Sequence, residues 1–201
     1  TVLDMSVVRN LHQQLEYQAV TDPLTGLLNR RGFYQAAEGA LLRNERSDKA
    51  QALMYMDLDG FKRINDSLGH DTGDRVLRWV GEQLKDCLGS QALLARMGGD
   101  EFTALFDSLP YPEQAGRYAE QLLERISISH QIEGLDVCLG VSIGIATYPD
   151  CGANVEGLLR AADAAMYAAK QAGHQQYRFY DQELNGRARS RLMLEDGVRT
   201  A

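Results

Sequence analysis

Hydrophobic and polar residues alternate along the chain in blocks that predict strands and helices in mixed order. The longest regular alternation covers residues 137–145, where large and small side chains follow one another as they do in a strand. An apolar run at 52–56 stops at Asp57 and Asp59, which predicts a strand buried on both faces and ending in carboxylates. Three further strands are expected, the first two joined as a hairpin, at 93–97, 102–106 and 177–180.

Apolar residues with a period near 3.6 predict helices between these strands. The clearest inner face belongs to residues 30–46 and comprises Phe33, Ala36, Ala37, Ala40 and Leu41. The other predicted helices cover residues 2–20, 61–68, 71–88, 112–128, 154–171 and 182–198, with Asn154 as an N-cap and Gly173 closing the helix that Asn154 opens. This order favours one α/β (α+β) layered domain with a partly antiparallel sheet.

Composition narrows the functional classes. The chain has 201 residues, of which 44% are hydrophobic, enough for one domain with its own core. Its formal net charge of −7 and lack of a Lys/Arg stripe argue against nucleic-acid binding. No apolar run approaches the ~20 residues of a membrane span, so we expect no membrane contact by this chain. Three cysteines without ligand or redox spacing fit a reducing, cytoplasmic setting.

Two acidic elements could carry chemistry. Asp57 and Asp59 point the same way from an extended chain, and their carboxylates would suit Mg²⁺; the alternative is a strand-to-helix turn with a capping Asp. Gly98 and Gly99 allow positive φ at a hairpin tip and a close approach of a ligand. Asp100-Glu101 follows them directly, and adjacent acids repel unless they share a cation, although an exposed hairpin with solvated acids is also possible.

Taken together, these elements suggest a nucleotide site. Asp57 and Asp100 could surround one metal, and Lys62 could supply a cation one turn into the next helix. Asn65 and Asp74 have the hydrogen-bonding groups needed to read a guanine base. Lys170 could reach phosphates, or could be a solvated lysine at a helix C-terminus.

Six ordered motifs resemble the GGDEF domain family of diguanylate cyclases. They are DPLTGLLNRR (22–31), DLDGFKRIND (57–66), GHDTGD (69–74), RMGGDEF (96–102), VSIGIA (141–146) and ADAAMYAAK (162–170). The resemblance covers about residues 20–181. It implies a central five-stranded, mostly antiparallel sheet flanked by helices, similar to nucleotidyl cyclase and polymerase palm domains. It also implies condensation of two GTP into cyclic di-GMP between two domains that face each other as an antiparallel dimer.

The resemblance also implies roles for individual residues. Asp57, the Leu58 carbonyl and Asp100 would bind Mg²⁺ (or Mn²⁺). Catalysis would belong to Asp100, Lys62 and Glu101, with Asp100 helping to deprotonate the attacking 3′-hydroxyl. The substrate-binding residues would be Asn65 and Asp74 for guanine, Phe61 and Lys170 for phosphates, and His70, Gly98 and Gly99. For His70, a local structural role is the alternative, and Arg96 is expected to brace the hairpin.

Two positions depart from the family pattern. His174 stands where many members carry an Arg four residues after the Lys that aligns with Lys170, which implies weaker or pH-dependent phosphate binding. Gly89 and Ala92 replace the Arg and Asp of the product-inhibition motif upstream of the hairpin, so we expect weak inhibition by cyclic di-GMP.

The domain plan follows from the extent of the resemblance. Residues 1–20 are expected to form a signalling or linker helix, 21–181 the GGDEF domain, and 182–201 a linker helix leading to an EAL phosphodiesterase domain. A locally packed terminal helix is the alternative for that tail. The chain is thus expected to be a piece of a longer protein with covalently linked sensory and EAL domains. Two other functions stay open: a GTP-binding regulatory module without turnover, and a dimerisation scaffold, against which the acids at 57, 100 and 101 argue.

Overall fold

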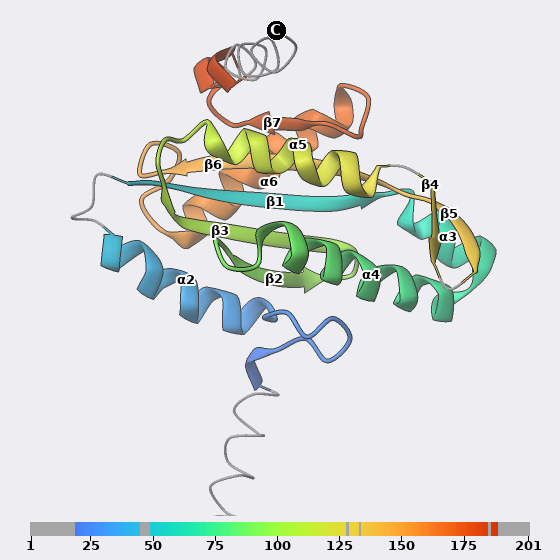
Figure 1. Cartoon of the computed structure of the whole chain (residues 1–201). Helices are drawn as coiled ribbons and strands as arrows, with labels where there is room; N and C mark the ends of the chain where they lie inside the picture. Colours follow the sequence, from blue (N-terminus) through green and yellow to red (C-terminus); the bar gives the residue numbers. More distant parts are fainter. Residues whose placement is uncertain (1–18, 45–48, 128, 133, 185, 189–201) are drawn as a thin grey trace, which may run out of the picture.

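The computed structural model describes residues 19–44, 49–127, 129–132, 134–184 and 186–188, and Figure 1 shows their arrangement. Most of the helix predicted at 2–20 and the end of the one predicted at 182–198 lie outside the described residues. The elements are α2 (Arg30–Asn44), β1 (Ala50–Asp59), α3 (Phe61–Leu68), α4 (His70–Leu88), β2 (Leu93–Gly98), β3 (Glu101–Leu109), α5 (Gln114–Ile126), β4 (Ser129–Ile132), β5 (Leu135–Cys138), β6 (Gly140–Tyr148), α6 (Val155–Gln171) and β7 (Tyr177–Phe179).

The main sheet has five strands in the order β2-β3-β1-β6-β7. Its pairs are antiparallel except for β6 with β7, which run parallel. Strand β1 lies at the centre and pairs with β3 on one side and β6 on the other. The predicted five-stranded, mostly antiparallel sheet flanked by helices is therefore confirmed.

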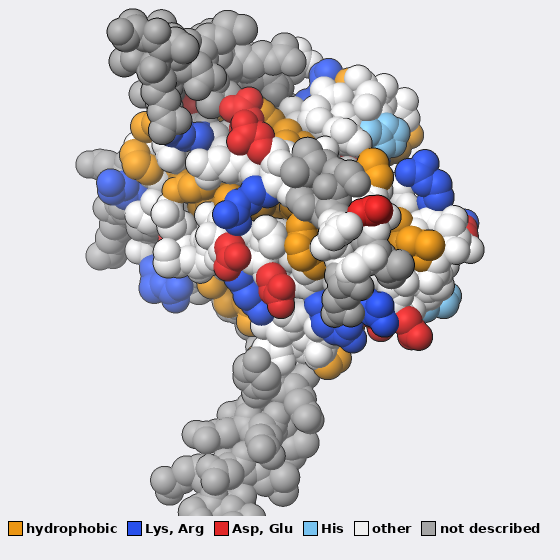
Figure 2. Space-filling model, turned by 45° about the vertical axis from the view of Figure 1, so that its right-hand side comes forward, with side chains coloured by type: hydrophobic (Ala, Val, Ile, Leu, Met, Phe, Trp, Pro, Cys, Tyr) orange, Lys and Arg blue, Asp and Glu red, His pale blue; other side chains and the backbone are white. Residues whose placement is uncertain are grey.

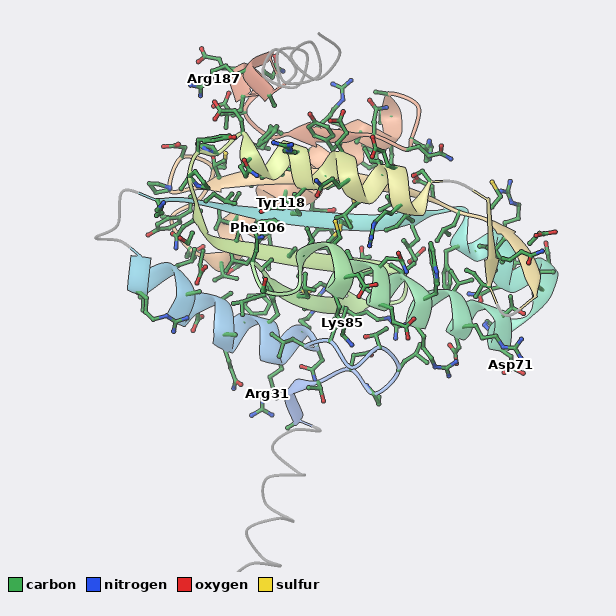
Figure 3. The ribbon with its side chains drawn as sticks, viewed as in Figure 1. Arg31, Asp71, Lys85, Phe106, Tyr118 and Arg187 are labelled. Atoms are coloured by element: carbon green, nitrogen blue, oxygen red, sulfur yellow. The ribbon has the colours of Figure 1, made fainter. Side chains whose placement is uncertain are left out.

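Side chains that alternate along the sheet strands pack into two separate hydrophobic cores, one on each face of the sheet. Met54 and Met56 of β1 face the helices α4 and α5, whereas Leu53 and Tyr55 face α2 and α6. On the α5 side, Tyr118 stacks on Phe106 of β3 with ring centroids 5.1 Å apart (Figure 3). Because β1 is covered on both faces, its buried run ends only where the acidic residues begin.

The prediction of one continuous strand at 137–145 is wrong, because the structure divides this segment between two strands. Strand β5 ends at Cys138 and β6 begins at Gly140. The first part pairs with β4 in a two-stranded hairpin, and the second part pairs with β1. Sequence alternation persists across the break because Val137 of β5, Leu139 between the strands and Val141 of β6 are all buried.

The helix ends mostly follow their sequence signals. Asn154 caps α6, and its side-chain oxygen accepts a hydrogen bond from the Gly157 N–H at 2.8 Å. Gly173 lies in the closing turn with φ +125°. Ala36 is only half-buried, not inward like its neighbours Phe33 and Ala37, so the inner face of α2 is narrower than predicted. No described helix is both long and apolar enough to cross a membrane.

We predict that Gly144→Ala strongly destabilises the domain. A Cβ at Gly144 would lie 1.9 Å from the Ala162 carbonyl oxygen and 2.3 Å from the Met166 nitrogen, so α6 would have to move off β6. Overpacking a core typically costs about 1–3 kcal/mol of the free energy of unfolding. We expect a loss at the upper end of this range or above it, because the atoms in the way belong to the backbone of α6 and cannot rotate aside. Urea unfolding measures the loss.

Gly39→Ala is the matched control. In α2, its added methyl would meet only the flexible end of Arg43 at 3.2 Å, and a helical Gly→Ala change gains roughly 0.5–1 kcal/mol. Equal stabilities for the two variants would contradict the close packing of α6 on β6.

Candidate active site

The acidic end of β1 lies beside the tip of the β2–β3 hairpin. Asp57 is directly opposite Glu101 of β3 and Ser142 of β6 in the sheet register. The Leu58 N–H donates a hydrogen bond to the Asp100 carbonyl oxygen at 3.3 Å, which attaches the hairpin tip to β1. The pairing therefore brings together acids that are more than forty residues apart in the sequence.

Lys170 completes this group. Its Nζ lies 2.6 Å from Asp57 Oδ1, and the two side chains are 26% and 16% exposed. The pKa of Asp57 is raised: burial is the largest cause, the hydrogen bond from Lys170 opposes it, and the charges of Asp100 and Asp59 add to it. Burial therefore keeps the ionised form of Asp57 unfavourable even beside the Lys170 ammonium, so a further cation would be favourable here.

The donor set fits a magnesium-type ion that is shared with a nucleotide. No group of three or more His, Cys, Asp or Glu side chains able to hold a metal occurs among the residues that the structure describes. Mg²⁺ commonly uses only one or two protein carboxylates and takes its other ligands from water and substrate phosphates. Asp57 and Asp100, whose charges interact, supply such a pair.

Glu101 has a partner that the sequence did not reveal. The hydroxyl of Tyr55, two residues before Asp57 on the same face of β1, lies close enough to the Glu101 carboxylate for the two groups to interact. Burial raises the pKa of Tyr55, and the neighbouring charge of Glu101 raises it further. Tyr55 therefore stays protonated beside the Glu101 carboxylate. A lone polar aromatic residue in an apolar strand was the available signal for this contact.

The residues expected to read guanine lie on the helices α3 and α4. Asn65 Oδ1 is buried and has no hydrogen-bond partner among the residues that the structure describes. A Cβ at Gly73 would lie 1.9 Å from that oxygen, so the glycine leaves the space into which Asn65 points. Asp74 lines a shallow cleft with Asp71, Arg75 and Arg78; Figure 3 labels Asp71 at the start of α4. An unpaired buried acceptor is costly, which fits an amide that awaits a donor.

The remaining predicted site residues differ in how far they are exposed to solvent. Phe61 is buried in the core, so only its backbone could meet a ligand. Lys62 and His70 are exposed, and no described contact ties either of them to Asp57. Gly98 and Gly99 have φ of +151° and +50°, and an added Cβ on either would meet nothing within 4 Å. The hairpin tip is therefore open, and its glycines are required by backbone conformation, not by crowding.

Arg96 braces the hairpin, as predicted. Its Nε and one terminal nitrogen donate to the Gly99 carbonyl oxygen at 2.9 and 2.8 Å. Its other terminal nitrogen donates to Asp22 at 3.2 Å. Asp22 also accepts the backbone N–H and the hydroxyl of Thr25, and the Lys85 ammonium donates to the Thr25 carbonyl oxygen at 2.9 Å (Figure 3). The turn after residue 21 thus supports the tip that carries Asp100.

Charges around this end of the molecule are mixed. Figure 2 shows acidic and basic side chains interspersed on the face that it presents, without a continuous basic stripe. This face therefore carries no row of cations of the kind that follows a nucleic-acid backbone.

A family comparison decides what kind of domain this is. The sequence profile described as "Diguanylate cyclase, GGDEF domain" matches residues 19–176. The chain belongs to the GGDEF family. The resemblance inferred from the six sequence motifs is therefore confirmed.

Known relatives and structures agree with this assignment. The GGDEF chain is 39% identical over 201 residues to the bifunctional diguanylate cyclase/cyclic di-GMP phosphodiesterase MucR of Pseudomonas aeruginosa, covering 100% of this chain and 29% of MucR. It is 35% identical over 190 residues to the cyclic di-GMP phosphodiesterase NbdA of the same organism, covering 94% of this chain and 24% of NbdA.

Among solved structures, the GGDEF domain of TpbB from Pseudomonas aeruginosa superimposes with a TM-score of 0.76 at 34% identity, covering 82% of this chain and 96% of that one. The chain spans less than a third of the length of MucR and NbdA.

We predict that the Asp22 contact loses its stabilising effect in acid. Burial tends to raise the pKa of Asp22, but the hydrogen bonds from Thr25 and the charge of Arg96 together bring it below its ordinary 3.8. A lowered folded-state pKa stabilises the domain above the unfolded-state value, and this effect is lost as pH falls through the folded-state value. Asp22→Asn should therefore cost about 1–3 kcal/mol at pH 7 and progressively less below about pH 4.

Urea unfolding from pH 7 to pH 3 tests this expectation. Asp86→Asn, at an exposed position on α4, is the control and should match wild type throughout. A difference between wild type and Asp22→Asn that does not shrink in acid would contradict the role of the ionised carboxylate.

Proposed function

We propose that this GGDEF domain is a diguanylate cyclase, which condenses two GTP molecules into cyclic di-GMP and releases two pyrophosphates. The observation that carries the proposal is the cluster at the end of β1. Asp57 is paired with Lys170 at 2.6 Å, and the hairpin tip with Asp100 is bonded to the next residue of the strand. Carboxylates for a metal and an ammonium for phosphates are the groups that nucleotidyl transfer requires.

In the proposed reaction, the 3′-oxygen of one GTP forms a bond to the α-phosphorus of the other. The bond from that phosphorus to the pyrophosphate oxygen breaks, and Asp100 helps to accept the hydroxyl proton. A second such step closes the ring. Mg²⁺ or Mn²⁺ held by Asp57, the Leu58 carbonyl and Asp100 would supply charge neutralisation and a lowered pKa of the 3′-hydroxyl.

The other residues would bind and orient substrate. Asn65 and Asp74 would hold guanine, and the unpaired Asn65 oxygen supports this assignment. Lys62 and Lys170 would neutralise phosphate charge, and Phe61 would contribute its backbone. Gly98 and Gly99 would let the nucleotide lie against the hairpin, and Glu101 would lie beside Tyr55. His70, at the exposed start of α4, would contact the substrate.

Each domain would hold one GTP, so two domains would have to meet as an antiparallel dimer. We place the GGDEF domain at residues 21–181, with linker helices before and after it and an EAL domain beyond. Within residues 182–184 and 186–188, Leu184 and Ala188 are buried and Arg187 pairs with Glu113 at 3.3 Å (Figure 3), so this part of the tail packs on the domain, as the alternative of a locally packed helix expects. Linkage to an EAL domain accords with the bifunctional name of MucR. A cytoplasmic location fits GTP as substrate.

The experiment that tests the proposal is incubation of the purified chain with GTP and Mg²⁺ over a dilution series. Cyclic di-GMP should form, and specific activity should rise with protein concentration because each domain contributes half of the site. GTP binding is measured on the same samples. Binding of GTP without cyclic di-GMP, even at high protein concentration over hours, would overturn the cyclase assignment.

That outcome would favour a second function, a GTP-binding module that regulates a linked EAL domain without turnover. Two observations support this alternative. NbdA, 35% identical, is named as a phosphodiesterase alone. His174 occupies the place of a phosphate-binding Arg, and its ring nitrogen lies 4.0 Å from Asp59.

We predict that Asp100→Ala abolishes cyclic di-GMP formation and leaves the fold intact, because Asp100 lies in the turn of the hairpin and not in either core. Product formation and urea unfolding measure the two effects. Asp150→Ala is the matched control, because Asp150 is also an aspartate in a turn but lies far from the candidate site. It comes two residues after Tyr148, which pairs with Gln51 at the opposite end of β1 from Asp57. Near-normal activity of Asp100→Ala would contradict the site assignment.

A further inference from the structure

Asp59 is the second acid at the end of β1, and its surroundings differ from those of Asp57. Its side chain is only 8% exposed. The Ser142 hydroxyl lies 2.8 Å from Oδ2 and 3.0 Å from Oδ1, and the backbone N–H of Gln175 donates to Oδ2 at 3.1 Å. Neutral donors from two distant segments therefore occupy the carboxylate.

The turn that Asp59 holds has an unusual backbone. His174 and Gln175 have φ of +62° and +47°, a conformation that non-glycine residues keep only when surrounding contacts enforce it. The hydrogen bond from the Gln175 N–H to Asp59 is one such contact. The Gln175 side chain is another, because it lies so close over Gly140 that a Cβ there would be 2.7 Å from its Cγ.

This turn also closes the helix that carries Lys170. The N–H of Gly173 donates to the Lys170 carbonyl oxygen at 3.2 Å, and that of His174 donates to the Ala169 carbonyl oxygen at 3.3 Å. The Gln176 side chain donates to the same Ala169 oxygen at 3.0 Å. The last turn of α6 is thus connected to β1 through Asp59, two residues from the carboxylate that Lys170 contacts.

We propose that Asp59 is a positioning residue, which fixes the turn after α6 and so holds Lys170 against Asp57. Asp59 is then not a ligand of the metal, although its spacing from Asp57 in the strand would allow that role. Its carboxylate oxygens accept hydrogen bonds from the Ser142 hydroxyl and the Gln175 backbone N–H. Both donors are neutral, so they require an acceptor oxygen but not a negative charge. The kinetic part of this inference rests on the proposed cyclase function, whereas the structural part does not.

The test compares Asp59→Asn, Asp59→Ala and Ser142→Ala with Asp57→Asn. Amide exchange at Gln175 is followed by NMR, and Mn²⁺ binding is measured with a non-hydrolysable GTP analogue present. Removing a group that orients a functional residue typically costs about 10–100-fold. Asp59→Ala should therefore speed Gln175 exchange and raise the KM for GTP by at least about tenfold, with a smaller change in kcat. Ser142→Ala should shift both in the same direction.

Asp59→Asn separates positioning from metal ligation. Asn keeps an acceptor oxygen of the same shape, so exchange at Gln175 and Mn²⁺ affinity should stay within about threefold of wild type. Asp57→Asn removes a ligand charge and should weaken Mn²⁺ binding at least about tenfold. If Asp59→Asn weakens Mn²⁺ binding as much as Asp57→Asn does, Asp59 is a ligand and the proposal is overturned.

Unchanged exchange at Gln175 in Asp59→Ala would also overturn the proposal. Urea unfolding of each variant shows that it is folded before these comparisons are made. If the chain forms no cyclic di-GMP, the cyclase proposal fails, while exchange at Gln175 and Mn²⁺ affinity still decide the role of Asp59.

Discussion

The antiparallel pairing of β1 with both β3 and β6 is the constraint on which the rest of the domain depends. Both edges of the central strand are hydrogen-bonded to neighbouring strands, and helices cover both of its faces. The direction of β1 is therefore fixed along its whole length. A strand held in this way presents its last residues at a defined place. Asp57, Leu58 and Asp59 are these residues, and their partners in the neighbouring strands are fixed by the same register.

Placing carboxylates close together has an electrostatic cost, and the fold offsets it differently for each acid. Asp57 is paired with the Lys170 ammonium, Glu101 lies beside the protonated Tyr55 hydroxyl, and Asp59 accepts from a hydroxyl and a backbone amide. Asp57 nevertheless keeps a raised pKa, because burial and the charges nearby outweigh the single ammonium. Burial is the largest cause, so the ionised Asp57 would gain from a cation beside it.

The acids are supported from outside the sheet as well. Arg96 joins the Gly99 carbonyl to Asp22, and Lys85 of α4 holds the turn that contains Thr25. On the other side, the close contact of Gly144 with α6 sets how near Lys170 can come to β1. Short-range backbone features thus determine the geometry of side chains that lie far from them in the sequence.

The sequence alone determined most of the elements, but not β4 or the break between β5 and β6, and it supplied most of the candidate site residues. Hydrophobic period, turn glycines and a capping Asn predicted the strands, the hairpin and α6, because these signals act over a few residues. The resemblance to the GGDEF family then supplied the roles proposed for Asp57, Asp100, Asn65 and Asp74.

Only the tertiary structure decided which strands pair and what each acid touches. Alternation is the same in any sheet, so it could not show that 135–138 pairs with β4 while 140–148 pairs with β1. The hydrogen bonds of Asp59 with Ser142 and Gln175 span 83 and 116 residues, and the interaction of Tyr55 with Glu101 joins β1 to β3. Such contacts depend on strand register and helix packing, which local propensity does not encode.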